Sequence, residues 1–203
     1  MKEITYLALG DSYTIGESVD STERYPYLLS KDLEKFDIRV KERKIIATTG
    51  WTTTNLKDGI GNAGINGGKY DMVSLLIGVN NQYQGRSLEE YKTEFEELLN
   101  TSISFANGNK DNVFVISIPD YGYTPFGQSN QASISLEIDQ FNEANKKIAD
   151  SLGVAYFDIT PISRNGLSDP DLIASDGLHP SGKMYQQWVD LMIEEVAALI
   201  KAD

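Results

Sequence analysis

Short apolar runs alternate along this chain with longer segments in which apolar side chains recur every three or four residues. The short runs are typical of buried parallel strands, and the longer segments are typical of helices packed on a sheet. We predict strands at the runs rich in Val, Ile, Leu or Tyr, which are residues 4–9, 40–47, 72–77, 113–118 and 154–157. The pattern indicates a three-layer α/β/α fold around a five-stranded parallel sheet.

Helices are predicted between these strands. Ser87 and Glu90 have the spacing of a capping box, and the apolar residues from 88 to 99 then share one helical face. A last helix is predicted at residues 181–200, again from apolar side chains at helical spacing. The remaining predicted helices are residues 25–36, 133–152 and, interrupted by glycine, 53–59.

Composition limits the partners of the chain. It has 203 residues, 40% of them apolar, and no repeat or linker divides it, so we expect a single domain over residues 1–203. It carries 30 acidic and 18 basic residues, a net charge of −12, without any run of Lys or Arg. Such a surface repels phosphate backbones, and we expect no nucleic-acid partner.

The kinds of segment and residue that the sequence lacks exclude further classes of protein. No stretch approaches the roughly 18 apolar residues of a membrane-spanning helix, so we expect no stable membrane insertion. The first residues lack the apolar segment of a secretory signal, which predicts a cytoplasmic protein, or an exported one if a signal peptide has been removed. With no cysteine and one histidine, we expect no metal and no cofactor. The sequence indicates no oligomeric state.

A serine follows the first predicted strand, where parallel α/β sheets bind ligands beyond the carboxyl ends of their strands. The segment reads Gly10-Asp11-Ser12-Tyr13-Thr14 and would present Ser12 on a turn as a nucleophile. Asp11 and Ser12 equally suit the N-cap of a helix. The segment differs from the Gly-x-Ser-x-Gly turn of the α/β-hydrolases, because Thr14 stands where that motif has glycine.

The only histidine stands just before the last predicted helix, three residues after an aspartate. At this spacing Asp176 can hydrogen-bond the imidazole of His179 and fix its tautomer, leaving the other ring nitrogen as a base. The alternative is a surface histidine without a chemical role. Residues 158–175 form a long connection, which gives this turn the reach to approach Ser12.

Two further strand-end loops offer hydrogen-bond donors for an oxyanion. Gly50 follows the second strand and offers its N–H, while Asn80 follows the third and offers its side-chain amide. Each could instead be an ordinary turn residue. If the strand order is 2-1-3-4-5, the ends of strands two, one and three are neighbours, so Gly50, Ser12 and Asn80 meet at one place.

These motifs, in this order, resemble those of the GDSL hydrolases, also called SGNH hydrolases, and the resemblance runs over residues 4–188. The motifs that carry it are Gly10-Asp11-Ser12-Tyr13-Thr14, Gly50, Gly78-Val79-Asn80 and Asp176-Gly177-Leu178-His179-Pro180. The resemblance implies a flavodoxin-like fold and a serine hydrolase that cleaves small-molecule esters or thioesters through an acyl-enzyme. It also implies a triad of Ser12, Asp176 and His179, and an oxyanion hole formed by Ser12, Gly50 and Asn80.

Two positions depart from the family's common pattern. Tyr13 follows the serine, which is a mild difference. Asn81 stands where the family commonly has Asp, so we expect different hydrogen bonding around Asn80 and the same reaction class.

Residues beside these motifs are expected to line the substrate site. They are Asp11, Tyr13, Trp51, Asn81, Tyr83, Tyr121 and Tyr123. The loop at residues 119–131, with three aromatic side chains, is the best candidate for a wall, although such aromatic residues often cap the core instead. The sequence leaves the substrate open among acylated carbohydrates, short-chain esters and lysophospholipids.

Two other functions fit parts of the sequence. Residues 12–16 could hold a flavin phosphate at a helix N-terminus, in a flavodoxin-like module without hydrolase activity. The chain could also be a non-catalytic interaction module. Neither function accounts for Gly50, Asn80 and the pair of Asp176 and His179.

Overall fold

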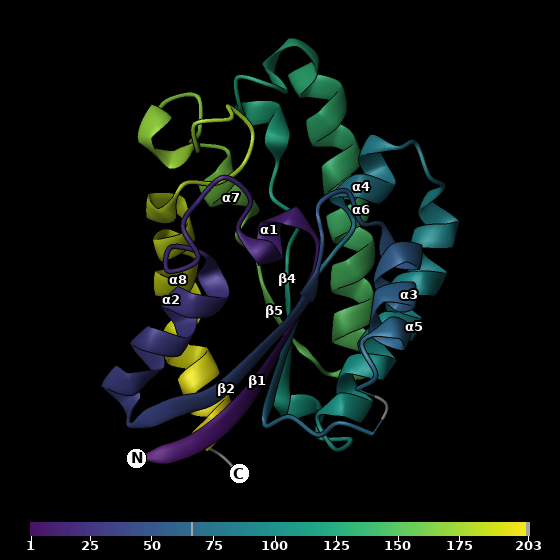
Figure 1. The fold of residues 1–203 in the computed structure, drawn as a ribbon. Coiled ribbons are helices and arrows are strands. Elements are labelled where there is room, and N and C mark those ends of the chain that lie inside the picture. Colours follow the sequence, from purple (N-terminus) through teal and green to yellow (C-terminus); the bar gives the residue numbers. More distant parts are fainter. Residues whose placement is uncertain (66, 202–203) are drawn as a thin grey trace.

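The computed structural model describes residues 1–65 and 67–201. In this part of the chain, five parallel strands form one sheet with helices on both faces (Figure 1). The strands are β1 (Lys2–Gly10), β2 (Ile38–Ala47), β3 (Met72–Leu76), β4 (Val113–Ile116) and β5 (Ala155–Phe157). They are ordered β2-β1-β3-β4-β5, and each neighbouring pair is parallel. The predicted fold class and strand order are therefore confirmed.

Helices form the two outer layers of the fold. One face of the sheet is covered by α2 (Tyr25–Asp32) and α8 (Gly182–Lys201), and the other by α3 (Thr53–Asn62), α5 (Leu88–Phe105) and α6 (Gln131–Leu152) (Figure 1). Three short helices stand just beyond the carboxyl ends of strands: α1 (Ser12–Ile15), α4 (Val79–Tyr83) and α7 (Thr160–Ser163). The 3-10 helices are η1 (Leu33–Phe36), η2 (Lys110–Asn112), η3 (Tyr121–Tyr123), η4 (Gln128–Asn130) and η5 (Pro170–Leu172).

The long helices lie where the sequence predicts them. The Ser87 hydroxyl accepts a 3.1 Å hydrogen bond from the N–H of Glu90, so α5 begins at the predicted cap. The helix predicted at residues 25–36 is divided into α2 and η1, because the tighter 3-10 turn and a left-handed residue, Asp37 (φ 59°), redirect the chain into β2. The three short helices were not predicted, since four or five residues do not reveal a helical period.

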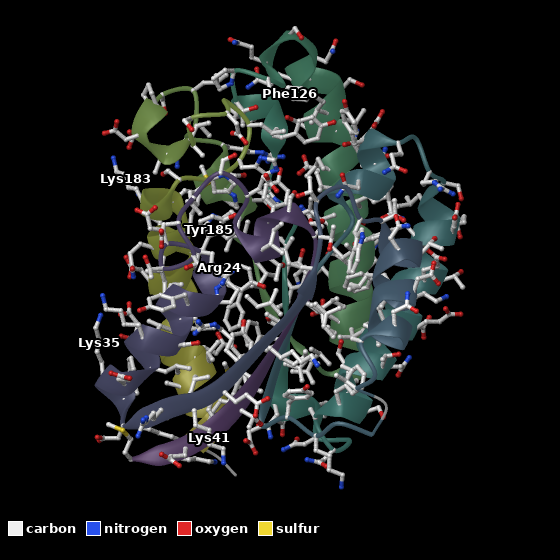
Figure 2. The ribbon with its side chains drawn as sticks, viewed as in Figure 1. Arg24, Lys35, Lys41, Phe126, Lys183 and Tyr185 are labelled. Carbon is white, nitrogen blue, oxygen red and sulfur yellow. The ribbon has the colours of Figure 1, made fainter. Side chains whose placement is uncertain are left out.

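The layer between α8 and the sheet is rich in buried aromatic side chains. Tyr185 points from α8 into the interior, while Lys35 and Lys183 project from the periphery (Figure 2). The Trp188 ring is fully buried, with its centroid 4.9 Å from that of Tyr185 and 6.3 Å from that of Tyr25. This packing fixes α8, and with it the turn that precedes α8, against the rest of the fold.

Candidate active site

Ser12 stands at a sharp turn between β1 and α1. The Oδ1 of Asp11 accepts a 3.0 Å hydrogen bond from the N–H of Tyr13 and so caps α1. A Cβ on Gly10 would lie 2.1 Å from the hydroxyl oxygen of Thr14, so only glycine allows α1 to fold back against the end of β1. The segment is therefore both a helix cap and a turn that presents the Ser12 hydroxyl beyond the strand end.

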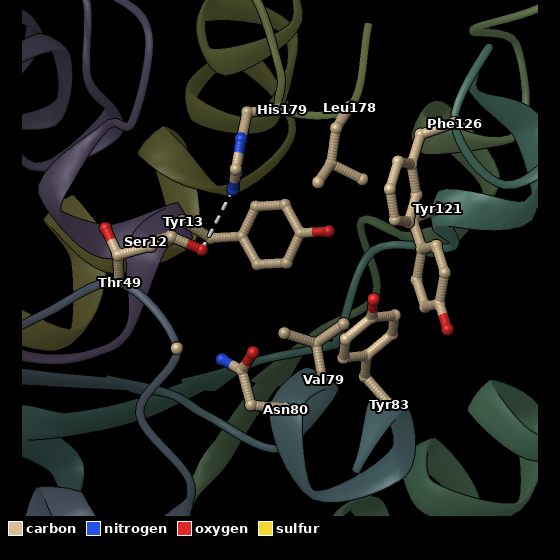
Figure 3. A pocket seen from close by; sticks show the side chains of 11 residues that line it. Ser12, Tyr13, Thr49, Val79, Asn80, Tyr83, Tyr121, Phe126, Leu178 and His179 are labelled. Atoms are coloured by element: carbon tan, nitrogen blue, oxygen red, sulfur yellow. Dashed lines mark hydrogen bonds between the residues drawn. The ribbon is translucent and has the colours of Figure 1, made fainter. Parts of the chain in front are cut away.

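A continuous chain of hydrogen bonds links the serine, the histidine and an aspartate, and Figure 3 shows its first contact, between Ser12 and His179. The Ser12 Oγ lies 3.1 Å from the Nε2 of His179. The Nδ1 of the same ring lies 2.6 Å from the Oδ2 of Asp176. The other carboxylate oxygen of Asp176 accepts the N–H groups of Leu178 and His179 at 2.9 and 3.0 Å. This turn holds the carboxylate, and the carboxylate orients the imidazole.

The carboxyl of Asp176 is held in its ionised form. Burial would raise its pKa, but hydrogen bonds from the His179 ring, the Ser18 hydroxyl and two backbone N–H groups outweigh burial and lower the pKa well below its usual range. The carboxylate therefore stays charged at neutral pH. A negative charge beside Nδ1 favours a proton on that nitrogen and stabilises an imidazolium.

The two candidate oxyanion loops reach the same place as Ser12. Gly50 follows β2 and has a left-handed φ of 81°, a conformation that glycine adopts readily. Asn80 lies in α4 after β3, and its side-chain amide donates a 3.0 Å hydrogen bond to the Trp51 carbonyl. Among the described residues, the N–H groups of Ser12 and Gly50 donate no hydrogen bond. Because β2, β1 and β3 are neighbours, these donors meet at one end of a cavity.

The cavity has a volume of about 170 Å³ (Figure 3). Its lining residues are Ser12, Tyr13, Thr49, Gly50, Val79, Asn80, Tyr83, Tyr121, Phe126, Leu178 and His179. None of these lining residues is Lys, Arg, Asp or Glu. One part of the lining holds the polar groups described above, and the remainder is aromatic or aliphatic.

Three aromatic rings form a wall of the cavity (Figure 3). The ring centroid of Tyr83 lies 6.1 Å from that of Tyr121 and 6.2 Å from that of Phe126. Tyr83 is 59% exposed and Phe126 52% exposed, so the mouth of the cavity presents apolar surface to water. The Tyr121 hydroxyl donates a 2.9 Å hydrogen bond to the side-chain oxygen of Gln82, which fixes the innermost ring of this wall.

The described residues offer neither a cluster of metal-ligating side chains nor a helix able to cross a membrane. Residues 1–65 and 67–201 contain no group of three His, Asp or Glu side chains placed to hold a metal ion. Over the same residues, no helix has the length and apolar character needed to cross a membrane.

Comparison with protein families decides the class of this chain. Residues 8–187 match the model of the GDSL-like lipase/acylhydrolase family. The chain belongs to that family. It is accordingly a hydrolase of the esterase type, as the motifs predict. No curated protein matches the sequence.

Solved structures share the fold of this GDSL-like hydrolase. The psychrotrophic esterase EstA from Pseudoalteromonas sp. is 18% identical, with a TM-score of 0.70 over 97% of this chain and 98% of the other. The lipase/acylhydrolase from Enterococcus faecalis is 18% identical, with a TM-score of 0.71 over 98% and 96%. The acetylxylan esterase Axe2 from Geobacillus stearothermophilus is 20% identical, with a TM-score of 0.73 over 95% and 94%.

Asn81 has a structural role in this GDSL-like hydrolase. Its side-chain oxygen accepts the N–H of Thr53 at 3.0 Å, and its amide donates to the Thr53 hydroxyl at 2.7 Å. The buried side chain therefore joins α4 to the start of α3. It positions the helix that carries Asn80 and does not face the cavity.

Four residues expected to line the substrate site lie elsewhere, and Asn81 is one of them. Asp11 is fully buried beneath the turn, where it caps α1. The ring of Trp51 packs against Gly59 of α3. The ring of Tyr123 lies beside the guanidinium of Arg164, 6.0 Å from the ring centroid. Of the expected residues, the structure places Tyr13, Tyr83 and Tyr121 at the cavity.

Three lining residues were not expected from the sequence. They are Thr49, Val79 and Leu178. Val79 and Leu178 stand inside two of the motifs and Thr49 directly precedes Gly50, so position within or beside a motif is the signal that could have identified them. Of the residues that could hold a flavin phosphate, 12–15 form α1 and Gly16 is its C-cap, and the Ser12 hydroxyl contacts the imidazole.

Proposed function

We propose that this chain is a serine esterase in which Ser12 is the nucleophile, His179 the general base and Asp176 the residue that orients it. The observation that carries the proposal is the hydrogen-bonded chain from Ser12 Oγ through the imidazole to the carboxylate. The chain ends at a cavity that is also lined by Gly50 and Asn80, and the N–H groups of Ser12 and Gly50 and the Asn80 amide are the donors we propose for an oxyanion. Nucleophile, base and orienting group in this geometry are the components of acyl transfer through a covalent intermediate.

In the first half-reaction, Ser12 Oγ attacks the carbonyl carbon of the ester, and Nε2 of His179 takes the hydroxyl proton. The carbonyl oxygen becomes an oxyanion, which the N–H groups of Ser12 and Gly50 and the Asn80 amide stabilise. The bond to the alcohol oxygen then breaks, and His179 returns the proton to that oxygen. The products of this half are the free alcohol and an acyl-serine.

In the second half-reaction, a water molecule attacks the acyl carbon while His179 takes its proton. The tetrahedral intermediate collapses, the bond to Ser12 Oγ breaks, and His179 returns the proton to the serine oxygen. Asp176 stays ionised and stabilises the imidazolium in both halves. A thioester would follow the same steps, with sulfur in place of the leaving oxygen.

The cavity supports a small, uncharged substrate. A closed apolar cavity of about 150 Å³ holds a benzene molecule, so 170 Å³ is room for a group of about six non-hydrogen atoms. The lining has no Lys or Arg to pair with an anionic group, and the protein's net charge of −12 also repels anions. The similar structure Axe2 is an acetylxylan esterase, and an acetyl ester of a carbohydrate meets both conditions.

The test is ester hydrolysis by the purified protein together with labelling by a fluorophosphonate. Ser12→Ala and His179→Ala are expected to lose nearly all activity, about 10⁴-fold or more, and Ser12→Ala is expected to lose the label. Ser104→Ala, which removes an exposed serine of α5, is the matched control and keeps both. Full activity in either triad variant would end the proposal, and inactivation by EDTA would contradict it too.

A further inference from the structure

A tight turn directly after α1 contacts two other parts of the candidate site. Gly16 ends α1 in the left-handed conformation, and its N–H and that of Glu17 both donate to the Ser12 carbonyl, at 3.1 and 3.0 Å. The next residue, Ser18, is also left-handed, with a φ of 65°. We call Gly16, Glu17 and Ser18 the anchor turn. Its backbone is fixed directly to the residue that carries the nucleophile.

On one side the anchor turn contacts the triad carboxylate. The Ser18 hydroxyl donates a 2.7 Å hydrogen bond to the Oδ2 of Asp176, a residue 158 positions away in the sequence. The same oxygen lies 2.6 Å from the Nδ1 of His179. Ser18 and the imidazole therefore share one carboxylate oxygen, and Ser18 is positioned to set both the place and the charge of that oxygen.

On the other side the anchor turn contacts the loop that carries Gly50. The carboxylate of Glu17 accepts a hydrogen bond from the hydroxyl of Thr49, the residue before Gly50. Thr49 itself lines the cavity. Two successive side chains thus join the nucleophile's turn to the oxyanion loop and to the triad turn.

Ser18 stands at the third position of a tight turn, which the N–H of Val19 closes by donating to the Gly16 carbonyl at 3.4 Å, and a type II turn takes positive φ at that position. A residue with a Cβ is disfavoured at positive φ, and Ser18 is exposed, so burial does not compensate for the strain. Among the described residues, its side chain makes one hydrogen bond, the one to Asp176. Strained residues of this kind gather at functional sites, where the surrounding contacts hold them in place.

We infer that the anchor turn is a positioning element of the hydrolase: Ser18 holds the Asp176 carboxylate in register with His179, and Glu17 holds the Gly50 loop beside Ser12. The inference rests on the proposed function. Neither Glu17 nor Ser18 lines the cavity, so the turn acts on the chemical step through other residues. Its loss is expected to lower kcat and to leave KM unchanged.

Replacing Ser18 also changes the pH profile in a defined direction. Without the hydroxyl, Oδ2 loses a hydrogen-bond donor, so the carboxylate stabilises the imidazolium more strongly. The acidic limb of the pH profile, where kcat/KM falls as the pH decreases, therefore moves to higher pH. Asp11, whose pKa burial raises to about 7, is unchanged in the Ser18 variants. Tyr13 and Tyr185 interact with this carboxylate, and burial raises the pKa of both well above the ordinary value for tyrosine. They stay neutral across the limb and do not contribute to its shift.

The experiment compares Ser18→Gly with Ser18→Ala. Both remove the hydroxyl, but glycine also relieves the left-handed strain and alanine does not. We expect both variants to lose about 10-fold in kcat, the effect of one hydrogen bond to a charged group, with the acidic limb shifted upward. We expect Ser18→Gly to unfold at a higher urea concentration than Ser18→Ala.

A purely structural role for Ser18 gives a different result. Activity would then follow stability, and Ser18→Gly would keep the wild-type kcat and pH profile, which overturns the inference for Ser18. Asp37→Gly is the matched control, because Asp37 is another left-handed residue (φ 59°) and lies at the opposite end of the sheet, before β2. It relieves strain without touching the site and should leave kcat unchanged.

Glu17→Ala tests the second contact of the anchor turn. It removes the acceptor of the Thr49 hydroxyl and is expected to lower kcat several-fold, with the acidic limb unmoved because Asp176 keeps its donors. An unchanged kcat would overturn the part assigned to Glu17. The proposed function is tested separately: an active Ser12→Ala protein refutes it, whereas an inactive Ser12→Ala protein beside a fully active Ser18→Gly protein refutes the positioning role alone.

Discussion

The hydroxyl of Tyr185 donates a 2.9 Å hydrogen bond to the backbone carbonyl of Tyr13, a residue 172 positions earlier in the sequence. Both side chains are buried. Tyr185 stands in the first turns of α8, six residues after His179, and Tyr13 follows Ser12. The contact therefore ties the helix behind the His179 imidazole to the helix that begins with Ser12, and core packing sets the distance between the Ser12 hydroxyl and the imidazole.

Tyr185→Phe removes this contact with little change of shape. The buried carbonyl of Tyr13 loses its donor, and an unsatisfied buried acceptor costs about 1–3 kcal/mol. We expect the free energy of unfolding to fall by that amount in urea denaturation. Tyr27→Phe is the control, because the Tyr27 ring lies half-exposed against Arg43. Equal stability of the two variants would show that the contact between α8 and α1 contributes nothing.

Asn80→Ala is expected to lower kcat and to leave some activity. Loss of one oxyanion donor reduces kcat by about 10² to 10³, and the N–H groups of Ser12 and Gly50 remain. Gln84→Ala is a matched control, since Gln84 also follows β3 and donates to the Gly50 carbonyl at 3.3 Å without lining the cavity. A similar loss of kcat in both variants would show that Asn80 acts by holding the loop and not by binding the oxyanion.

The main features of the site could be predicted because its chemistry is concentrated in short motifs. Strand order follows from alternating strands and helices, and that order alone brings the segments after β2, β1 and β3 together. The Asp176 turn could be read locally, since aspartate and histidine three residues apart share one turn. These predictions needed the sequence near each strand end and no detail of packing.

Side-chain directions outside the motifs could not be predicted. Trp51 and Tyr123 stand beside motif residues, yet Trp51 packs on a glycine of α3 and Tyr123 on Arg164. Partners that are distant in the sequence decide where such rings lie. The same holds for Ser18, whose contact with Asp176 spans 158 positions and depends on a left-handed conformation that no local pattern indicates.

The aromatic wall is expected to limit the length of the acyl or alcohol group. For a series of nitrophenyl esters, kcat/KM should fall once the chain exceeds about six carbons, because the cavity of 170 Å³ is close in size to one that holds benzene. Tyr83→Ala opens the wall. Each further methylene that becomes buried contributes about 0.8 kcal/mol, about fourfold in kcat/KM, so longer esters should gain relative to acetate.

Leu136→Ala is the control for that series, since Leu136 is 62% exposed on α6 and does not line the cavity. It should leave the profile of chain lengths as in the wild type. A Tyr83→Ala protein with the wild-type profile would place the chain of the substrate outside this cavity.

Asp11 is expected to make stability depend on pH. Burial raises the pKa of its carboxyl to about 7, although hydrogen bonds from N–H groups oppose the shift. In the unfolded chain an aspartate titrates near 3.9, so between about pH 4 and pH 7 the folded state holds a proton that the unfolded state has lost. The contribution of Asp11 to the free energy of unfolding is fully present below pH 4. It is lost as the pH rises towards 7, by up to about 1.4 kcal/mol per pH unit.

Asp11→Asn removes this titration and keeps an oxygen that can accept the N–H of Tyr13. Relative to the wild type, the variant should therefore gain stability steadily from pH 5 to pH 7 and no further above pH 8. Urea denaturation at each pH measures the difference, with Asp58→Asn, an exposed carboxyl of α3, as the matched variant. If the difference between Asp11→Asn and wild type is the same at every pH, the buried carboxyl does not retain its proton and α1 is capped by a carboxylate throughout.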